Sequence, residues 1–465
     1  MPRRKPKRRN NSTTVILTLL IVLMIAATAF VIHLCADLVN KEPGRSDKSG
    51  STITLPGAAP GSETEPAETT QPETVQVVST ATIGAQGDLL MHKPVMNSCR
   101  LEDGTYDFES IFRYVSEYTA SYDYAVANLE TTLGGTDYPY QGNPEFNCPD
   151  SILDAVTAAG YDMLLTANNH CSDTHTNGLL RTLEQVRGQG LATLGTQLSD
   201  DEDKYAIVDV NGIRIGMLCY TYADSVTSDG RPSLNFREAV KKVGLVNYFT
   251  ETNLEKFYAE VQSLLAEMEA QGAEATMLYI HWGIEYETTE NATQRAIAQK
   301  MCDLGIDVIV GGHPHVVQPM DLLSSTTDPD HKTVCIYSLG NAVSNQRAAE
   351  MRLNTGHTED GALFTVTFEK YSDGTVYVAA TDVIPTWVNL SSVNGKTEYN
   401  ILPLDFDRYS EWQSLYNLTD ALYASAGNAY DRTMAIVGSG LEECQTYLDQ
   451  AKADREAYYQ GLAAA

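Results

Sequence analysis

The stretch Asp307-Val-Ile-Val-Gly-Gly-His313-Pro-His315 joins a short apolar run directly to two histidines that are separated by one residue. A short apolar, β-branched run bounded by glycines is typical of a buried strand. In an open α/β sheet, reactive side chains gather just beyond the carboxyl ends of the strands. The sequence therefore predicts that His313 and His315 lie at a sheet edge, where a ligand or a metal ion can reach them.

Four other predicted strands end in residues of the same kind. They contribute Gly87-Asp88 followed by His92, Asn128-Leu-Glu130, Asn168-Asn169-His170, and His281-Trp-Gly. These donors are oxygen and imidazole nitrogen without sulfur, which suits Mn²⁺, Fe²⁺ or Zn²⁺ better than soft ions. A carboxylate can bridge two cations, and two cations about 3.5 to 4 Å apart can activate water and stabilise a phosphoryl or acyl oxygen. We therefore expect a site for one or two divalent ions (Mn, Fe or Zn).

Each motif alone also has a purely structural explanation. A Gly-Asp pair after a strand is commonly a turn, Asn168-Asn169-His170 fits a loop with an Asx turn, and His281 fits a hydrogen-bonded histidine at the rim. His92 follows Asp88 closely enough to bind the same ion, and it suits the start of a surface helix equally well. The occurrence of all these motifs after successive strands favours the metal site.

Apolar β-rich runs alternate with helical ones from about residue 75, which predicts a layered α/β domain. Two hairpins interrupt the alternation, at Asn211-Gly212 and Asp373-Gly374, where the turn residues tolerate positive φ. Together these patterns predict two sheets with helices outside, over residues 75–400. Residues 401–465, rich in Tyr, Ala, Gln and acids, predict a helical C-terminal extension that packs on the domain or offers a surface to a partner.

The N-terminus places six cations among its first eleven residues, ahead of a run without charged residues at 13–36. Such a run is long enough to cross a hydrocarbon core of about 30 Å, and it is longer than the core of a typical cleaved signal. We therefore expect residues 13–36 to be a transmembrane anchor, with the basic segment 1–12 in the cytoplasm. Residues 37–74 are rich in Ser, Thr, Pro and Glu and predict a disordered linker. The protein is expected to be single-pass in the cell membrane, with its folded domain extracytoplasmic.

The formal net charge of −29 at pH 7 restricts the possible partners. An acidic body repels nucleic acid and anionic lipid, so no nucleic-acid partner is expected. Any anionic ligand must be held by local cations or metal ions. The chain also contains no Gly-x-Ser-x-Gly elbow, no Walker-type loop and no dinucleotide-binding glycine fingerprint, so serine hydrolase, P-loop and NAD-dependent activities have no support.

Taken in order, the motifs resemble the CapA family of capsule and poly-γ-glutamate biosynthesis proteins, whose domain is similar to calcineurin-like metallophosphatases. The resemblance covers about residues 78–390 and rests on Gly87-Asp88, Asn128-Leu-Glu130, Ala167-Asn-Asn-His170 with Asp173, His281-Trp-Gly-Ile-Glu285-Tyr, Gly312-His-Pro-His315-Val and Tyr337-Ser-Leu-Gly-Asn341. It implies a four-layer α/β/β/α sandwich with a metal site between loops.

The resemblance also implies roles for single residues. Asp88 and His315 would hold one metal ion, and Glu130 would take the place of a bridging aspartate. The second ion would be held by Asn169, His281 and His313. His170 would act near the leaving group as an acid or an electrostatic stabiliser, and Asp173 is the second catalytic candidate. His92 is a further candidate ligand, and the positions expected to support the ligands or contact substrate are Asn128, Asn168, Glu285 and Asn341.

This chain departs from the metallophosphatase pattern at two ligand positions. The usual Asp-x-His becomes Asp88 followed by His92, and the bridging aspartate becomes Glu130. Either change can alter metal affinity or remove one of the two ion sites. The resemblance therefore leaves the enzymatic activity open.

The leading expectation is a membrane-anchored CapA-like protein that acts in the synthesis, export or anchoring of an anionic surface polymer, by metal-assisted hydrolysis or transfer. One alternative is a non-catalytic accessory subunit that binds the polymer or the subunits of a polymer synthase. Another is a general phosphoesterase of the envelope, which keeps the metal site but acts on other phosphoesters.

Overall fold

The computed structural model describes residues 75–464 except 354 and 394. The predicted basic segment 1–12, anchor 13–36 and linker 37–74 lie outside the described residues, so these expectations stay predictions. Within the described part of the chain, no helix is both long enough and apolar enough to cross a membrane.

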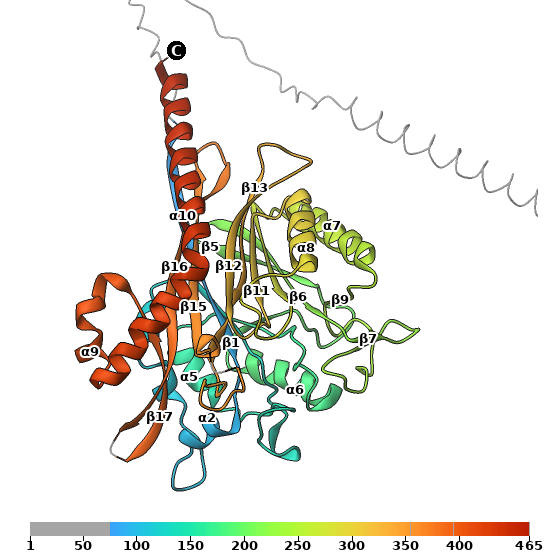
Figure 1. Ribbon diagram of the computed structural model, residues 1–465. Coiled ribbons are helices and arrows are strands. Elements are labelled where there is room, and N and C mark those ends of the chain that lie inside the picture. The colour runs from blue at the N-terminus through green and yellow to red at the C-terminus, as the bar shows by residue number, and fades with distance from the viewer. Residues whose placement is uncertain (1–74, 354, 394, 465) are drawn as a thin grey trace, which may run out of the picture. The chain divides into compact units, whose positions relative to one another are not determined.

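The first sheet combines parallel strands from the N-terminal half with antiparallel strands from the C-terminal half (Figure 1). Its strands in spatial order are β17 (Lys396–Pro403), β16 (Val376–Val393), β15 (Asp360–Tyr371), β1 (Val77–Leu89), β2 (Tyr124–Asn128), β3 (Met163–Leu165) and β4 (Ala192–Leu194), and β14 (Asn341–Val343) also pairs with β1. Strands β1 to β4 are mutually parallel. Their carboxyl ends therefore meet at one edge.

The second sheet is mixed as well. Its strands in order are β12 (Val317–Ser324), β13 (Lys332–Leu339), β11 (Val308–Gly312), β10 (Ala275–His281), β6 (Ile213–Tyr222) and β5 (Tyr205–Val210), with β9 (Tyr248–Phe249) paired to β6. The four inner strands β13, β11, β10 and β6 are parallel. A separate small hairpin is formed by β7 (Ser225–Val226) and β8 (Pro232–Ser233).

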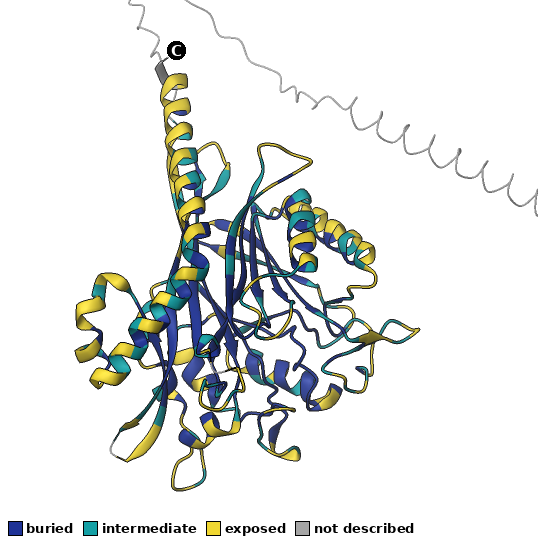
Figure 2. Cartoon of the chain, viewed as in Figure 1, coloured by how far each residue is buried: buried dark blue, intermediate teal, exposed yellow. Residues whose placement is uncertain are grey.

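Three apolar clusters hold the layers together, and the strands that form them are almost continuously buried (Figure 2). One cluster lies between the two sheets and joins residues such as Ile83 of β1 and Met277 of β10. A second covers the outer face of the first sheet with α2 (Lys93–Ser98), α3 (Glu109–Phe112) and α5 (Ile152–Ala158). A third covers the second sheet with α7 (Leu254–Ala270) and α8 (Ala292–Asp303). The described residues therefore form an α/β sandwich built on two packed sheets.

The remaining helices are short, apart from two. They are α4 (Ser116–Thr119), α6 (His175–Gly188), α9 (Trp412–Leu415), α10 (Asp420–Ala464) and the 3₁₀ turns Gly135–Asp137, His357–Glu359 and Phe406–Glu411. Strand β17 ends at Pro403, beyond the boundary expected at residue 400, and helical structure follows it.

The C-terminal region is largely one helix of 45 residues, α10, which packs along β12 and β16 (Figure 1). Val437, Leu441, Cys444 and Leu448 of α10 are buried in the cluster between the sheets. A Cβ added at Gly440 would lie 1.9 Å from the carbonyl oxygen of Met320, so glycine is needed for this close approach. Of the two roles expected for the extension, the structure therefore shows packing on the domain.

Both predicted hairpins are confirmed. Asn211 and Gly212 connect antiparallel β5 and β6 with φ of 55° and 81°. β15 and β16 are likewise antiparallel, and Gly374 in their connection has a φ of 91°. These left-handed conformations are those that asparagine and glycine adopt most readily.

Candidate metal centre

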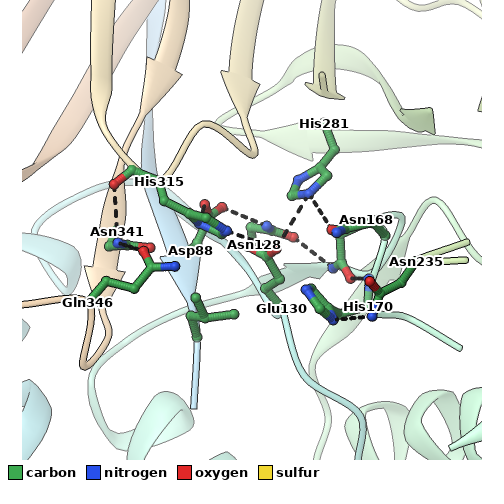
Figure 3. A network of polar contacts seen from close by, with 12 residues as sticks. Asp88, Asn128, Glu130, Asn168, His170, Asn235, His281, His315, Asn341 and Gln346 are labelled. Carbon is green, nitrogen blue, oxygen red and sulfur yellow. Dashed lines mark hydrogen bonds and ion pairs between the residues drawn. The ribbon is translucent and has the colours of Figure 1, made fainter. Parts of the chain in front are cut away.

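Five parallel strands from both sheets end at the same place and carry the predicted site residues (Figure 3). Strand β1 supplies Asp88, and the residues at or just beyond the ends of β2 and β3 supply Asn128, Glu130, Asn168, Asn169 and His170. From the second sheet, β10 supplies His281, and the turn after β11 supplies His313 and His315. Because the sheets are packed face to face, strand ends that are far apart in sequence converge on one buried centre.

The turn Gly312-His313-Pro-His315 has an unusual backbone. His313 and His315 have φ of 97° and 58°, a region that costs residues other than glycine about 1–3 kcal/mol. A Cβ on Gly312 would lie 3.3 Å from Oδ1 of Asp88, so a side chain there would crowd the carboxylate. The chain therefore retains local strain and a glycine where the turn brings His315 beside Asp88 and places His313 and His315 near Glu130.

Asp88 is fully buried and has partners for both oxygens. Asn128 Nδ2 donates to Oδ1 at 2.8 Å, and His315 Nδ1 lies 3.1 Å from Oδ2. Burial alone would raise the pKa of Asp88, but the hydrogen bond to His315 and the nearby imidazoles hold the pKa below its usual value. Asp88 is therefore an anionic ligand with a fixed orientation.

Glu130 is also fully buried, but neither of its carboxylate oxygens has a hydrogen-bond partner in the described part of the chain. Its Oε1 lies 3.5 Å from His281 Nε2 and 3.9 Å from His315 Nε2. Burial and the charge of Asp88 raise the pKa of Glu130 well above its usual value. A carboxylate in such surroundings is costly unless a cation compensates for it, so the orphaned oxygens fit a metal ion.

Two sets of ligand atoms lie close enough together to hold an ion, with the atoms of each set within 4.8 Å of one another. They are Asp88, Glu130 and His281, and Glu130, His313 and His315. Glu130 belongs to both sets, as a bridging ligand would. The resemblance to metallophosphatases pairs His281 with His313 instead, so the geometry groups the same residues in a different way.

The imidazoles of His281 and His313 are suited to bind a cation because their lowered pKa values keep them neutral. Burial lowers the pKa of His281 to about 3 and that of His313 well below its usual value. Nδ1 of His313 is buried and has no hydrogen-bond partner among the described residues. His281 Nε2 lies 2.9 Å from Asn169 Oδ1, so Asn169 is close enough to share an ion with it. The donor set of this centre therefore fits a divalent metal.

His170 and Asp173 form a pair beside the metal-ligand candidates. Nδ1 of His170 lies 2.8 Å from Oδ2 of Asp173, which also accepts a hydrogen bond of 2.6 Å from the Phe146 amide. Asn235 Nδ2 donates to Asp173 Oδ1 at 3.2 Å and lies 3.2 Å from His170 Nδ1 (Figure 3). The carboxylate therefore fixes the orientation of the imidazole and leaves its Nε2 for a substrate.

The other predicted positions surround this centre. Asn168 Nδ2 donates to Asn128 Oδ1 at 3.0 Å, which continues the chain of hydrogen bonds from Asp88. Asn341 Nδ2 donates to the His315 carbonyl at 3.2 Å and so holds the strained turn. Glu285 is exposed on the loop after β10, and its charge contributes to the raised pKa of Glu130.

His92 belongs to neither set of ligand atoms, so its expected role as a metal ligand stays a prediction. It precedes α2, and its Nδ1 accepts a 3.3 Å hydrogen bond from the Asn345 amide. Its ring packs edge-on against Phe146 with the ring centroids 5.1 Å apart. Burial lowers the pKa of His92 to about 4, so the ring is neutral. Pro94 in the first turn of α2 sets the helix start and with it the direction of this side chain.

Sequence reasoning missed several residues that contact the site, among them Tyr222 and Asn235. The ring of Tyr222, at the end of β6, has its centroid 4.9 Å from that of His313. Tyr222 ends a strand as the predicted ligands do, so its position was a usable signal. Asn235 lies in an irregular loop after β8, and nothing in its sequence context indicates contact with His170.

Comparison with known proteins agrees with these observations. The family described as bacterial capsule synthesis protein PGA_cap matches residues 82–346, more than half of the chain. The chain is 27% identical over 296 residues to the PGA biosynthesis protein CapA of Bacillus subtilis (strain 168), covering 62% of this chain and 70% of that protein. It is 27% identical over 310 residues to the capsule biosynthesis protein CapA of Bacillus anthracis, covering 64% and 65% respectively. The chain therefore belongs to the bacterial capsule synthesis family PGA_cap, and through it to the metallophosphatase-like superfamily.

Proposed function

We propose that this protein is a metal-dependent hydrolase or transferase that acts on an anionic surface polymer during its synthesis, export or anchoring. The observation that carries the proposal is Glu130, whose two buried oxygens have no hydrogen-bond partner among the described residues and whose Oε1 lies 3.5 Å from His281 Nε2 and 3.9 Å from His315 Nε2. The proposed frame is the four-layer α/β/β/α arrangement of metallophosphatases. It is supported by helices on the outer face of each packed sheet.

The ligands proposed for one or two divalent ions (Mn, Fe or Zn) are all buried and all lie at the ends of strands that converge on one centre. They are Asp88, Glu130, Asn169, His281, His313 and His315. A divalent cation bound there supplies Lewis-acid activation of water and of a phosphoryl or acyl oxygen. The strained His313-Pro-His315 turn and the Asn128 hydrogen bond hold the ligands in place before any ion binds.

The chain's own residues handle the proton. Asp173 holds Nδ1 of His170, so that Nε2 can carry a proton toward the leaving group. Cleavage of a phosphoester, ester or amide bond by water leaves an oxygen or nitrogen that must be protonated, and His170 would supply this proton. Asn235 positions the pair through Asp173 and does not itself meet the reacting bond.

The polymer assignment rests on the relatives, whose names refer to capsule and PGA biosynthesis. We propose the same class of substrate here, with the domain outside the cell membrane and residues 13–36 as its anchor. Subunits of a polymer synthase are the proposed protein partners. The −29 net charge supports a metal-dependent way of holding an anionic substrate, because the protein as a whole repels it.

A second function, that of a non-catalytic accessory subunit, is favoured by the position of His92. Its ring contacts Phe146 and the Asn345 amide instead of either ligand set, so this chain has fewer candidate ligands than the resemblance implied. In that case the centre would bind the polymer, with or without a metal ion, and would not cleave it. A general envelope phosphoesterase is distinguished from both by its substrates.

The test is the metal content of the full-length protein, purified mildly in detergent and supplied with Mn²⁺ or Zn²⁺. Wild type and His331→Ala, a control at a histidine outside the centre, should each retain about one to two ions per chain, and His313→Ala should lose most of them. Less than about one ion per chain in wild type, with metal saturating, would refute the metalloenzyme.

Two further readouts separate the candidate functions. Release of fragments from poly-γ-glutamate, compared with release of phosphate from simple phosphoesters, distinguishes the polymer enzyme from the general phosphoesterase. Full rescue of a polymer-deficient cell by the His313→Ala protein would favour the accessory role.

A further inference from the structure

The loop that follows the β7–β8 hairpin is basic in an otherwise strongly acidic protein. Residues 231–242 carry four cations and a single acid, whereas the whole chain has a net charge of −29. Two of these cations are already used, since Arg231 pairs with Asp229 and Arg237 with Glu145. Lys241 and Lys242 are exposed and have no ion pair among the described residues. Their charge is therefore available to a ligand.

The same loop reaches the candidate active site. Asn235 donates to Asp173 and to the Pro144 carbonyl, and its amide lies 3.2 Å from His170. The next residue, Phe236, is 90% exposed, the largest exposure among the large apolar side chains described. Phe236 directly follows the residue that contacts His170 and Asp173, so its exposed ring is available to a ligand that reaches the candidate active site.

The exposure of Phe236 is enforced by the loop and is not the result of loose packing. Asn235 and Phe236 have φ of 50° and 55°, a conformation that costs an ordinary residue about 1–2 kcal/mol. The Phe236 amide donates to Asp224 Oδ2 at 2.6 Å, and the neighbouring Leu234 and Val240 are fully buried. The fold thus maintains strain in order to present this ring. Such strain is characteristic of functional sites.

The lysines are fixed relative to the same site. The Lys241 amide donates to Thr176 Oγ1 at 2.9 Å, at the start of α6, which follows directly after the segment holding His170 and Asp173. One short loop therefore carries three features in sequence order. The Asn235 amide contacts His170 and Asp173, the Phe236 ring is exposed, and Lys241 and Lys242 have ammonium groups without an ion pair among the described residues.

We propose that this loop is the binding surface for an extended polycarboxylate chain, with Lys241 and Lys242 holding successive carboxylates and Phe236 packing on the aliphatic segment between them. A polycarboxylate is favoured over a phosphate polymer because the arginines, which match phosphate best, are already paired. The inference names the substrate class of the function proposed above and so rests on it. Polymer binding is nevertheless measurable without catalysis.

The experiment measures binding of fluorescently labelled poly-γ-glutamate to the full-length protein in detergent, in EDTA and in Mn²⁺, at low and moderate salt. The double variant Lys241→Gln/Lys242→Gln should bind about 5- to 10-fold more weakly, with a smaller salt dependence. A matched control at remote lysines, Lys300→Gln/Lys396→Gln, should stay within about 2-fold of wild type.

Phe236→Asn tests the ring without a loss of folding, because asparagine tolerates the left-handed conformation better than phenylalanine. It should unfold at the same temperature as wild type or a higher one, yet bind the polymer about 3- to 5-fold more weakly.

The inference would be overturned if the double-lysine variant bound poly-γ-glutamate as tightly as wild type does. It would also be overturned if wild type did not bind poly-γ-glutamate. Tighter binding of inorganic polyphosphate than of poly-γ-glutamate would also overturn it, in favour of a phosphate polymer. Normal polymer binding without bound metal or cleavage would instead contradict the proposed catalytic function and leave the binding surface standing.

Discussion

Replacing Glu130 with glutamine distinguishes two effects of this residue: the destabilisation caused by its buried charge, and its contribution to metal binding. In metal-free protein the carboxylate is fully buried, and both oxygens lack partners. Glutamine keeps the shape and removes the charge, so we expect the free energy of unfolding to rise by about 1–3 kcal/mol at neutral pH in EDTA. For a domain of this size the unfolding temperature should rise by about 1–2 °C per kcal/mol.

With metal present the order should reverse. A ligand at 100 times its Kd stabilises a protein by about 2.7 kcal/mol, and wild type should gain this amount from Mn²⁺ or Zn²⁺. Glu130→Gln should gain little, because it lacks the shared anionic ligand of both sets. The assay is thermal unfolding of the full-length protein across a metal titration, with Glu285→Gln as a control at an exposed carboxylate of the same site. Destabilisation of Glu130→Gln in EDTA together with an undiminished metal response would refute the reasoning.

Three further results are expected from the same structure. Burial lowers the pKa of His281 in the folded protein to about 3, whereas its pKa in the unfolded chain is about 6.5. The unfolded chain therefore binds more protons than the folded one in this range. As a result, the stability of the metal-free protein should fall as the pH drops from about 6.5 toward 4. This dependence of stability on pH is best measured in Glu130→Gln, because the raised pKa of Glu130 changes the stability in the opposite direction. Stability that stays constant with pH in this variant would contradict neutral buried imidazoles. Asp173→Asn should lower turnover on the order of 10²-fold, because His170 is then no longer held in place, while the metal content stays at the wild-type level. A loss of metal in parallel with turnover would instead indicate that Asp173 has a structural role. Gly440→Ala should destabilise the protein by about 1–3 kcal/mol, measured by chemical unfolding, because the added Cβ meets a carbonyl oxygen of β12. The metal content should not change. Unchanged stability would mean that α10 is not packed as described.

The convergence of the site could be predicted from the sequence because it depends on a simple rule of topology. His281 and His313 each follow an apolar run, and the carboxyl ends of parallel strands meet at one edge. The position of Glu130 at this edge followed from the same reasoning, although its burial and its lack of partners among the described residues did not. Hydrogen bonding of a buried carboxylate depends on side chains from four different strands, and no local pattern records it.

Features fixed by side-chain direction or tertiary packing could not be predicted. His92 is close to Asp88 in sequence, but the helix start at Pro94 directs it to Phe146. Asn235 reaches His170 from a loop whose strained backbone has no sequence signature beyond an ordinary Asn-Phe pair. The helical composition of the C-terminal region could be predicted from the sequence, whereas the packing of α10 along β12 and β16 depends on long-range contacts.

The central claim is that Glu130 and its neighbours hold divalent metal. The most direct measurement is a crystal structure of the protein grown with Mn²⁺, with anomalous diffraction recorded at the manganese edge. We predict an anomalous peak within about 2.0–2.3 Å of a Glu130 oxygen, and a second peak about 3.5–4 Å from it if both ligand sets are filled. An ordered, saturated crystal with no anomalous peak at Glu130 would contradict the claim.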